Sequence, residues 1–177
     1  PEQRGLLRIG LVHFARQPFD DRGLGLAGPL DGRMVLGAFA ILQICEFGLR
    51  MTIDASGPID PTGGLSPEES GPWGLVFGIA TACIAAPVAE EIVYRGVLFR
   101  SLANRLRVWP AVVISAIVFA LAHFYPWPSL IAVALVGAAC ALAYASSRTL
   151  LTAIALHALY NAAIKIPEWI VYQTPLS

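Results

Sequence analysis

The sequence predicts an all-α membrane protein, a polytopic bundle of about five transmembrane helices with room for an interfacial helix before them. Of its 177 residues, 56% are hydrophobic and only 14% are charged, well below the roughly 25% usual for soluble domains. The mean hydropathy is +0.66, and the length suits one domain. These observations argue against a water-soluble globule.

Five stretches are apolar along most of the roughly 20 residues that an α-helix needs to cross a hydrocarbon core of about 30 Å. They are residues 34–49, 73–99, 108–124, 129–145 and 149–166. Several are short for a full span, so we expect tilted helices, some of them extended by interfacial turns. Ser66 and Glu69 match a capping box, which predicts that the second helix starts just before Trp73.

The pattern divides the chain into two parts. Residues 1–33 form a cytoplasmic or interfacial segment, and residues 34–177 form the transmembrane domain, whose motifs lie within 73–165. The N-terminal segment has no uninterrupted apolar run, so we expect no signal peptide. A chain that starts at Pro1 leaves room for a further span upstream.

The N-terminal segment itself carries an amphipathic pattern. In residues 6–14 most side chains are apolar, and Arg4, Arg8 and Arg16 interleave with them. This pattern favours a basic amphipathic helix that lies on the membrane surface. A disordered tail is the alternative interpretation.

Charges in the connections predict the orientation. Arginines lie before the first span, after the second, and between the fourth and fifth, whereas the connection 54–71 carries acidic residues. By the positive-inside rule, the N-terminus faces the cytoplasm and the C-terminus, after five spans, faces outward. We expect an integral protein of the plasma (inner) membrane.

Charge balance and cysteine usage exclude two further classes. Twelve basic residues balance twelve acidic ones, and no basic run alternates with aromatic residues, so we expect the lipid bilayer but no nucleic acid as a partner. Cys45, Cys83 and Cys140 are far apart and embedded in apolar stretches. They are interpreted as packing residues, because they form neither a disulfide framework nor a metal pair.

The second span contains charged residues whose insertion into a membrane is energetically unfavourable. A carboxylate or Arg at the centre of a membrane helix costs about 2.5–3.5 kcal/mol on insertion scales. Glu91 and Arg95 are four residues apart and can pair along one helix face, whereas Glu90 has Tyr94 at that spacing. We therefore expect Glu91 to be a structural ion and Glu90 to be available for proton transfer. An interfacial salt-bridged anchor is the structural alternative.

Two histidines lie in later spans. His123 ends the apolar run of the third span, and His157 shares one face of the last span with Asn161, one turn further on. An isolated His on an apolar helix is more often a packed core residue than a ligand. Here a Glu, two His and an Asn come from three predicted helices, which favours a common polar site.

These residues carry a family resemblance. Residues 90–95 fit EExxxR, residues 119–123 fit FxxxH, and residues 157–161 fit HxxxN, in that order on successive apolar helices. The chain resembles the CPBP family (CaaX protease and bacteriocin-processing, or Abi) of intramembrane endopeptidases over roughly Trp73 to Lys165.

The resemblance implies an all-helical membrane core with four catalytic residues. Glu90 and His123 would activate a water, and His157 and Asn161 would stabilise the oxyanion. Peptide hydrolysis needs such a base and such donors, and it then requires no Ser or Cys nucleophile. The supporting residues implied by the motifs are Glu91, Arg95 and Phe119.

The expected substrate is a membrane-anchored or lipid-modified protein or peptide. The connection from His123 to His157 has room for only one span, shorter than in eukaryotic CaaX-processing members. This difference weakens the expectation of a prenylated CaaX substrate but leaves the reaction class unchanged.

Other interpretations remain open. We expect no cofactor, but Glu90, His123 and His157 are also a recognised zinc set, although the HExxH helix is absent. A transporter would also keep Glu and His in its spans, yet it would usually show an inverted repeat, which we do not find. A non-catalytic membrane scaffold or immunity protein is the third alternative.

Overall fold

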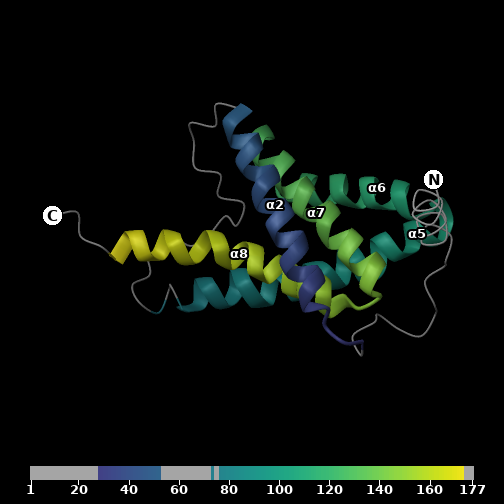
Figure 1. The fold of residues 1–177 in the computed structure, drawn as a ribbon, viewed down its shortest axis with the longest axis horizontal. Helices are drawn as coiled ribbons and strands as arrows, with labels where there is room; N and C mark the ends of the chain where they lie inside the picture. The colour runs from purple at the N-terminus through teal and green to yellow at the C-terminus, as the bar shows by residue number, and fades with distance from the viewer. Residues whose placement is uncertain (1–27, 53–72, 74–75, 174–177) are drawn as a thin grey trace, which may run out of the picture.

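The computed structural model describes residues 28–52, 73 and 76–173. Within these residues the secondary structure is helical, without a strand, so the predicted all-α class is confirmed. The elements, with π-helical segments written η, are α2 (Gly32–Thr52), η1 (Thr81–Ala85), α4 (Ala86–Glu91), η2 (Ile92–Phe99), α5 (Arg100–Leu106), α6 (Val108–Leu121), α7 (Trp127–Ser147) and α8 (Leu150–Gln173). Figure 1 shows their arrangement.

The predicted spans correspond to the observed helices. Four helical stretches are long and apolar enough to cross a membrane, namely Gly32–Leu49, Val76–Leu106, Trp127–Ser147 and Leu150–Pro167. The third predicted span is the short helix α6, which ends at Leu121 rather than at residue 124. A turn follows it, and Phe124 has a φ of 54° there. His123 therefore lies just beyond α6 and not within the helix.

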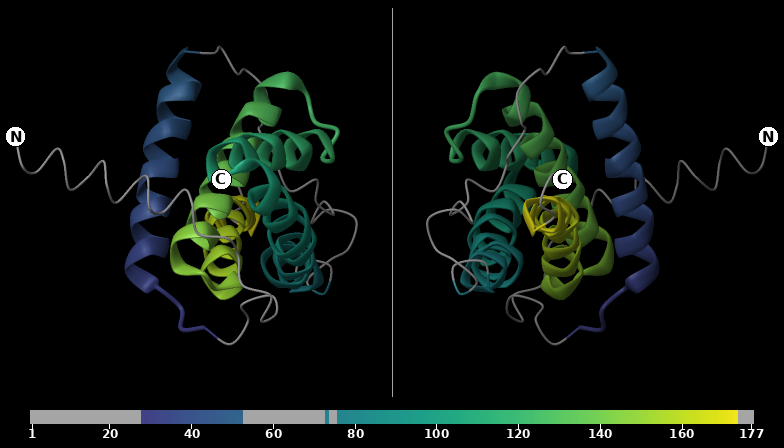
Figure 2. Two further views of the ribbon diagram at one scale, coloured as in Figure 1. Left: turned by 90° about the vertical axis from the view of Figure 1, so that its right-hand side faces the viewer. Right: turned by 90° about the vertical axis from the view of Figure 1, so that its left-hand side faces the viewer.

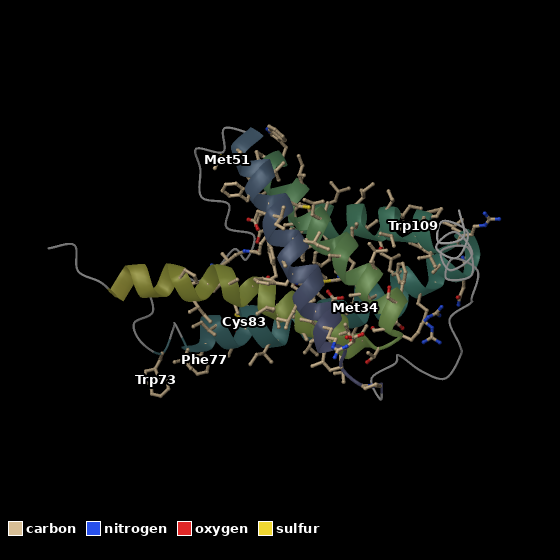
Figure 3. All side chains as sticks on the ribbon, viewed as in Figure 1. Met34, Met51, Trp73, Phe77, Cys83 and Trp109 are labelled. Carbon is tan, nitrogen blue, oxygen red and sulfur yellow. The ribbon has the colours of Figure 1, made fainter. Side chains whose placement is uncertain are left out.

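The distribution of side chains is inverted relative to a soluble protein. Large apolar residues such as Ile44, Phe77 and Trp109 are exposed, and Figure 3 places the latter two at the periphery of the bundle. Glu91 and Arg95 are 0% and 1% exposed. A surface this apolar around buried charges requires hydrocarbon as its solvent. The protein is an integral membrane protein.

Helix α7 has an almost entirely apolar or small-residue interface with its neighbours. It packs against α6 along one side and against α8 and α2 along others. Figure 2 shows α2 at one side of the bundle and the helix 76–106 at the other, with α7 and α8 between them. Gly137 allows the close approach of α6, since a Cβ there would lie 3.1 Å from Phe119 Cδ1 and 3.2 Å from Ala116 Cα.

The beginning of α2 is tied to the beginning of α8. Asp31 caps α2, because its Oδ1 accepts the backbone N–H of Met34 at 3.0 Å. The backbone N–H of Asp31 donates to Thr152 Oγ1 at 3.2 Å, and Thr149 Oγ1 donates to the carbonyl of Gly28 at 3.3 Å. These bonds fix α2 against the rest of the bundle.

Three predictions from the sequence fall on other residues. The amphipathic helix in residues 6–14, the capping box at 66–69 and the acidic connection 54–71 lie outside the described part of the chain. They stay predictions, as does the division of the chain at residue 34.

Candidate active site

The four predicted catalytic residues converge from three parts of the fold. Glu90 lies at the end of α4, His123 in the turn after α6, and His157 and Asn161 on α8. Glu90 Oε2 lies 3.8 Å from Nε2 of His123 and 3.9 Å from Nε2 of His157. One carboxylate oxygen thus faces the same nitrogen of two imidazoles, at distances too long for direct hydrogen bonds.

Glu91 and Arg95 form the predicted ion pair. Arg95 Nη1 donates to Glu91 Oε1 at 2.8 Å, and Nη2 donates to the carbonyl of Gly137 on α7 at 2.8 Å. The same Glu91 Oε1 also lies 2.9 Å from His157 Nδ1. Glu91 therefore holds both an arginine of its own helix and the imidazole of α8, a second contact that the sequence did not predict.

The Phe119 ring packs against the charged and imidazole side chains of the site. The Arg95 guanidinium lies 4.4 Å from the centre of its ring, within the range of a cation–π interaction. The ring also meets the imidazoles of His123 and His157 edge to face, with centroid distances of 4.7 and 5.7 Å. Phe119 is only 1% exposed, so it is a fixed apolar wall against which both imidazoles are oriented.

The partners of the two Nδ1 atoms determine what the Nε2 atoms can do. The carbonyl of Phe119 lies 2.7 Å from His123 Nδ1, and a carbonyl only accepts, so this nitrogen carries a proton. His157 Nδ1 likewise faces the Glu91 carboxylate. In a neutral ring, Nε2 then has a free lone pair, which both histidines direct toward Glu90.

Asn161 is oriented by an irregularity in the second span. Its Nδ2 donates to the carbonyl of Ala82 in η1 at 2.7 Å. In that segment the N–H of Ala86 bonds to Thr81, five residues earlier, so the next donor in the series would be residue 87. Residue 87 is proline, which has no N–H, and the Ala82 carbonyl is thus left for the side chain of Asn161.

A small cavity adjoins the site. Its volume is ≈ 10 Å³, close to the lower limit of about 10–15 Å³ that one water requires. The residues that line it are Phe119, His123, Val133, Val136, His157, Tyr160 and Asn161. Tyr160 was missed by the sequence analysis. Its hydroxyl donates to Glu46 of α2 at 3.1 Å, and Glu46 was visible in the sequence as a carboxylate within a span.

Three buried polar atoms have no hydrogen-bond partner within the described protein. They are Glu90 Oε2, Glu91 Oε2 and Arg95 Nε. Buried polar atoms are normally satisfied, and exceptions concentrate at functional sites. The unpaired oxygen of Glu90 is the one that faces the two imidazoles.

Comparison with known proteins places these residues in a family. A family model described as Type II CAAX prenyl endopeptidase Rce1-like matches residues 72–163, just over half of the chain. Searches of curated proteins and of solved structures gave no significant match. The matched segment contains all three motifs and excludes α2. It confirms the resemblance drawn from the motifs: the chain belongs to the Rce1-like family of type II CAAX prenyl endopeptidases.

Proposed function

We propose that this protein is an intramembrane endopeptidase in which Glu90 and His123 activate a water and His157 and Asn161 stabilise the oxyanion. Membership in an endopeptidase family supports the reaction class. The observation that carries the residue assignment is the position of Glu90 Oε2, 3.8 and 3.9 Å from two Nε2 atoms. Each imidazole is oriented through its other nitrogen by a separate partner.

The distance between Glu90 and His123 suits a shared water. A gap of 3.8 Å is too wide for a direct bond but allows one water to contact both groups. The water attacks the carbonyl carbon of the substrate, and Glu90 takes its proton. Glu90 then returns that proton to the amine that leaves when the C–N bond breaks. The side chain of Glu90 is 30% exposed, whereas its Oε2 is buried and has no hydrogen-bond partner within the described residues, which supports a bound water at this atom.

Asn161 and His157 face the cavity from the same helix. One N–H of the Asn161 amide is used by Ala82, which fixes the amide and leaves the second N–H for the developing oxyanion. His157 donates from Nε2 when its ring is cationic. The carboxylates of Glu91 and Glu90 flank the two nitrogens of that ring.

Zinc is the competing interpretation of the same residues. Zinc-bound histidines also donate their other ring N–H to a carboxylate or a carbonyl, as His123 and His157 do here. Tetrahedral ligands at about 2.1 Å from the metal lie roughly 3.4 Å from one another. The observed separations from Glu90 are 3.8 and 3.9 Å, and among the described residues no group of three or more His, Cys, Asp or Glu is placed to hold a metal ion, so the three residues would have to move closer together. They would then supply a metal-activated water.

The family supports a proposal for the substrate, and the charges of the connections support a proposal for the orientation. A family of CAAX prenyl endopeptidases points to a membrane-associated protein substrate that carries a lipid or a membrane anchor. Glu90 and His157 lie on helices that are long and apolar enough to cross a membrane, which suits such a substrate. By the positive-inside rule, the basic connections support a cytoplasmic N-terminus in the plasma membrane.

The experiment is a cleavage assay in detergent. The wild-type chain is incubated with a panel of membrane-anchored and lipid-modified peptides, and the products are identified by mass spectrometry. We expect cleavage that His123→Ala abolishes and that His13→Ala, which removes the N-terminal histidine, leaves intact. Absence of cleavage across the whole panel would count against the endopeptidase. Loss of cleavage with a chelator, restored by zinc, would move the mechanism to the zinc interpretation.

A further inference from the structure

We propose that α2 contributes to the active site. Glu46 is a positioning residue that fixes Tyr160 beside the catalytic residues of α8. The inference rests on the proposed function. The inference goes beyond that function because the family match begins at residue 72, so the matched segment includes neither α2 nor Glu46.

Glu46 is a buried carboxylate within a membrane span. It is 8% exposed, whereas its neighbours Ile44 and Phe47 are 71% and 62% exposed. The charged residue thus faces the bundle while the apolar residues beside it face lipid. Carboxylates are rare in membrane helices and occur where they have a specific partner. One partner here is the hydroxyl of Tyr160, which donates to Glu46 Oε2 at 3.1 Å.

Tyr160 connects this bond to the site. Its ring is 3% exposed and lines the same cavity as His157 and Asn161. It directly precedes Asn161 and lies one turn after His157 on the helix. A change in the position of its ring would therefore alter the wall of the cavity next to both oxyanion residues.

Two adjacent residues of α8 are thus held by two different helices. Tyr160 is bonded to α2, and Asn161 is bonded to η1. Successive residues of an α-helix point about 100° apart, so two such bonds fix the rotation of α8 about its axis. Figure 2 shows α8 between α2 on one side and the helix 76–106 on the other. Loss of the Glu46 bond removes one of the polar restraints on this part of α8, and it leaves those from Glu91 to His157 and from Asn161 to Ala82 in place.

The test measures turnover and stability in one set of variants. The variants are Glu46→Leu, Tyr160→Phe, their double variant and Glu46→Gln, with Gln43→Leu on the exposed face of α2 as the control. For each, kcat and KM are measured with a peptide that the wild type cleaves, together with the melting temperature in detergent. The melting temperature reports the loss of the hydrogen bond between Tyr160 and Glu46, whether or not the variant is active.

We expect kcat to fall roughly 10-fold in Glu46→Leu and in Tyr160→Phe with little change in KM, because misplacement of a site by about 1 Å can cost up to 10²-fold in rate. The double variant should be no slower and no less stable than the worse single variant, since both remove one interaction. Glu46→Gln keeps an acceptor oxygen and should retain more activity than Glu46→Leu.

Two results would overturn the proposal. Additive losses of melting temperature in the double variant would show that the two side chains do not act as a pair. A coupled pair whose single variants keep the wild-type kcat would show that the bond does not position the site. A wild-type chain that cleaves no peptide contradicts the proposed function instead, and the stability coupling distinguishes that failure from a failure of the contact.

Discussion

Glu90 and Glu91 are neighbours in the sequence but differ in environment. Glu91 is fully buried, and its Oε1 accepts from Arg95 and lies beside His157 Nδ1. The side chain of Glu90 is 30% exposed and forms no ion pair with Arg95. The spacing rule for ion pairs on a helix predicted this difference correctly. It could not predict the bond from Glu91 to His157, because those residues are 66 positions apart and meet only through helix packing.

The first prediction at this scale concerns Glu91. Replacing Glu91 by Ala leaves Arg95 as a buried charge without its carboxylate, which typically costs about 3–5 kcal/mol. We expect Glu91→Ala to lower the melting temperature strongly and to reduce the yield of folded protein, whereas Glu90→Gln should melt near the wild type. Equal melting temperatures for Glu91→Ala and the wild type would refute the structural role of the pair.

The second prediction concerns Pro87, which lies in the first turn of α4. Pro87→Ala restores a backbone N–H that can bond to the Ala82 carbonyl and so release Asn161. Since removal of one oxyanion donor can cost about 10²–10³ in kcat, we expect kcat to fall by at least about 10-fold. The melting temperature should not fall with it, because Ala favours helix more than Pro.

The matched control is Pro110→Ala in the first turn of α6, where proline is tolerated. It should keep the wild-type kcat. A Pro87→Ala protein with wild-type turnover would mean that the bond from Asn161 to Ala82 is not needed for catalysis.

At the scale of elements, hydropathy located the spans, but the local geometry of the helices could not be predicted from the sequence. The helix 76–106 changes from α to π geometry on both sides of Glu90 and Glu91. The sequence analysis did not predict that change, because hydropathy does not distinguish α from π geometry. The end of α6 was placed three residues too late, since the apolar run continues through the turn to Phe124.

The third prediction concerns the close packing of α6 against α7, which a substitution at Gly137 tests. In Gly137→Ala the new Cβ would press on Phe119 at 3.1 Å and on the backbone of Ala116 at 3.2 Å. Overpacking of this kind costs about 1–3 kcal/mol. We expect a lower melting temperature and reduced turnover, because Phe119 orients both imidazoles.

Gly37 provides the matched control for this substitution. It also lies in a long membrane helix, α2, but a Cβ there has no neighbour within 4 Å. Gly37→Ala should leave stability and turnover near the wild type. A Gly137→Ala protein as stable as Gly37→Ala would contradict the packing described for α6 and α7.

At the scale of the whole molecule, the composition predicted the membrane class, and the apolar exterior around buried charges bears it out. The motifs were sufficient to find the four catalytic candidates, because each is a polar residue in an apolar span. The contribution of α2 could not be found this way. Glu46 and Tyr160 are 114 residues apart, and only the fold brings them together.

Orientation is the prediction at this scale. By the positive-inside rule, the basic connections predict a cytoplasmic N-terminus. A protease added to inside-out vesicles should therefore remove an N-terminal epitope, and the same protease should leave it intact on right-side-out vesicles. The opposite pattern of cleavage would reverse the assigned topology.

The central claim is that Glu90 is the base of a hydrolytic centre. The most direct measurement is the single-turnover cleavage rate of Glu90→Gln, with Glu168→Gln near the end of α8 as the control. General acid–base catalysis typically contributes about 10²–10⁴-fold, so we predict a loss of that size in Glu90→Gln, at an unchanged melting temperature. The control should cleave at the wild-type rate. A Glu90→Gln rate within a few-fold of the wild type would contradict the account.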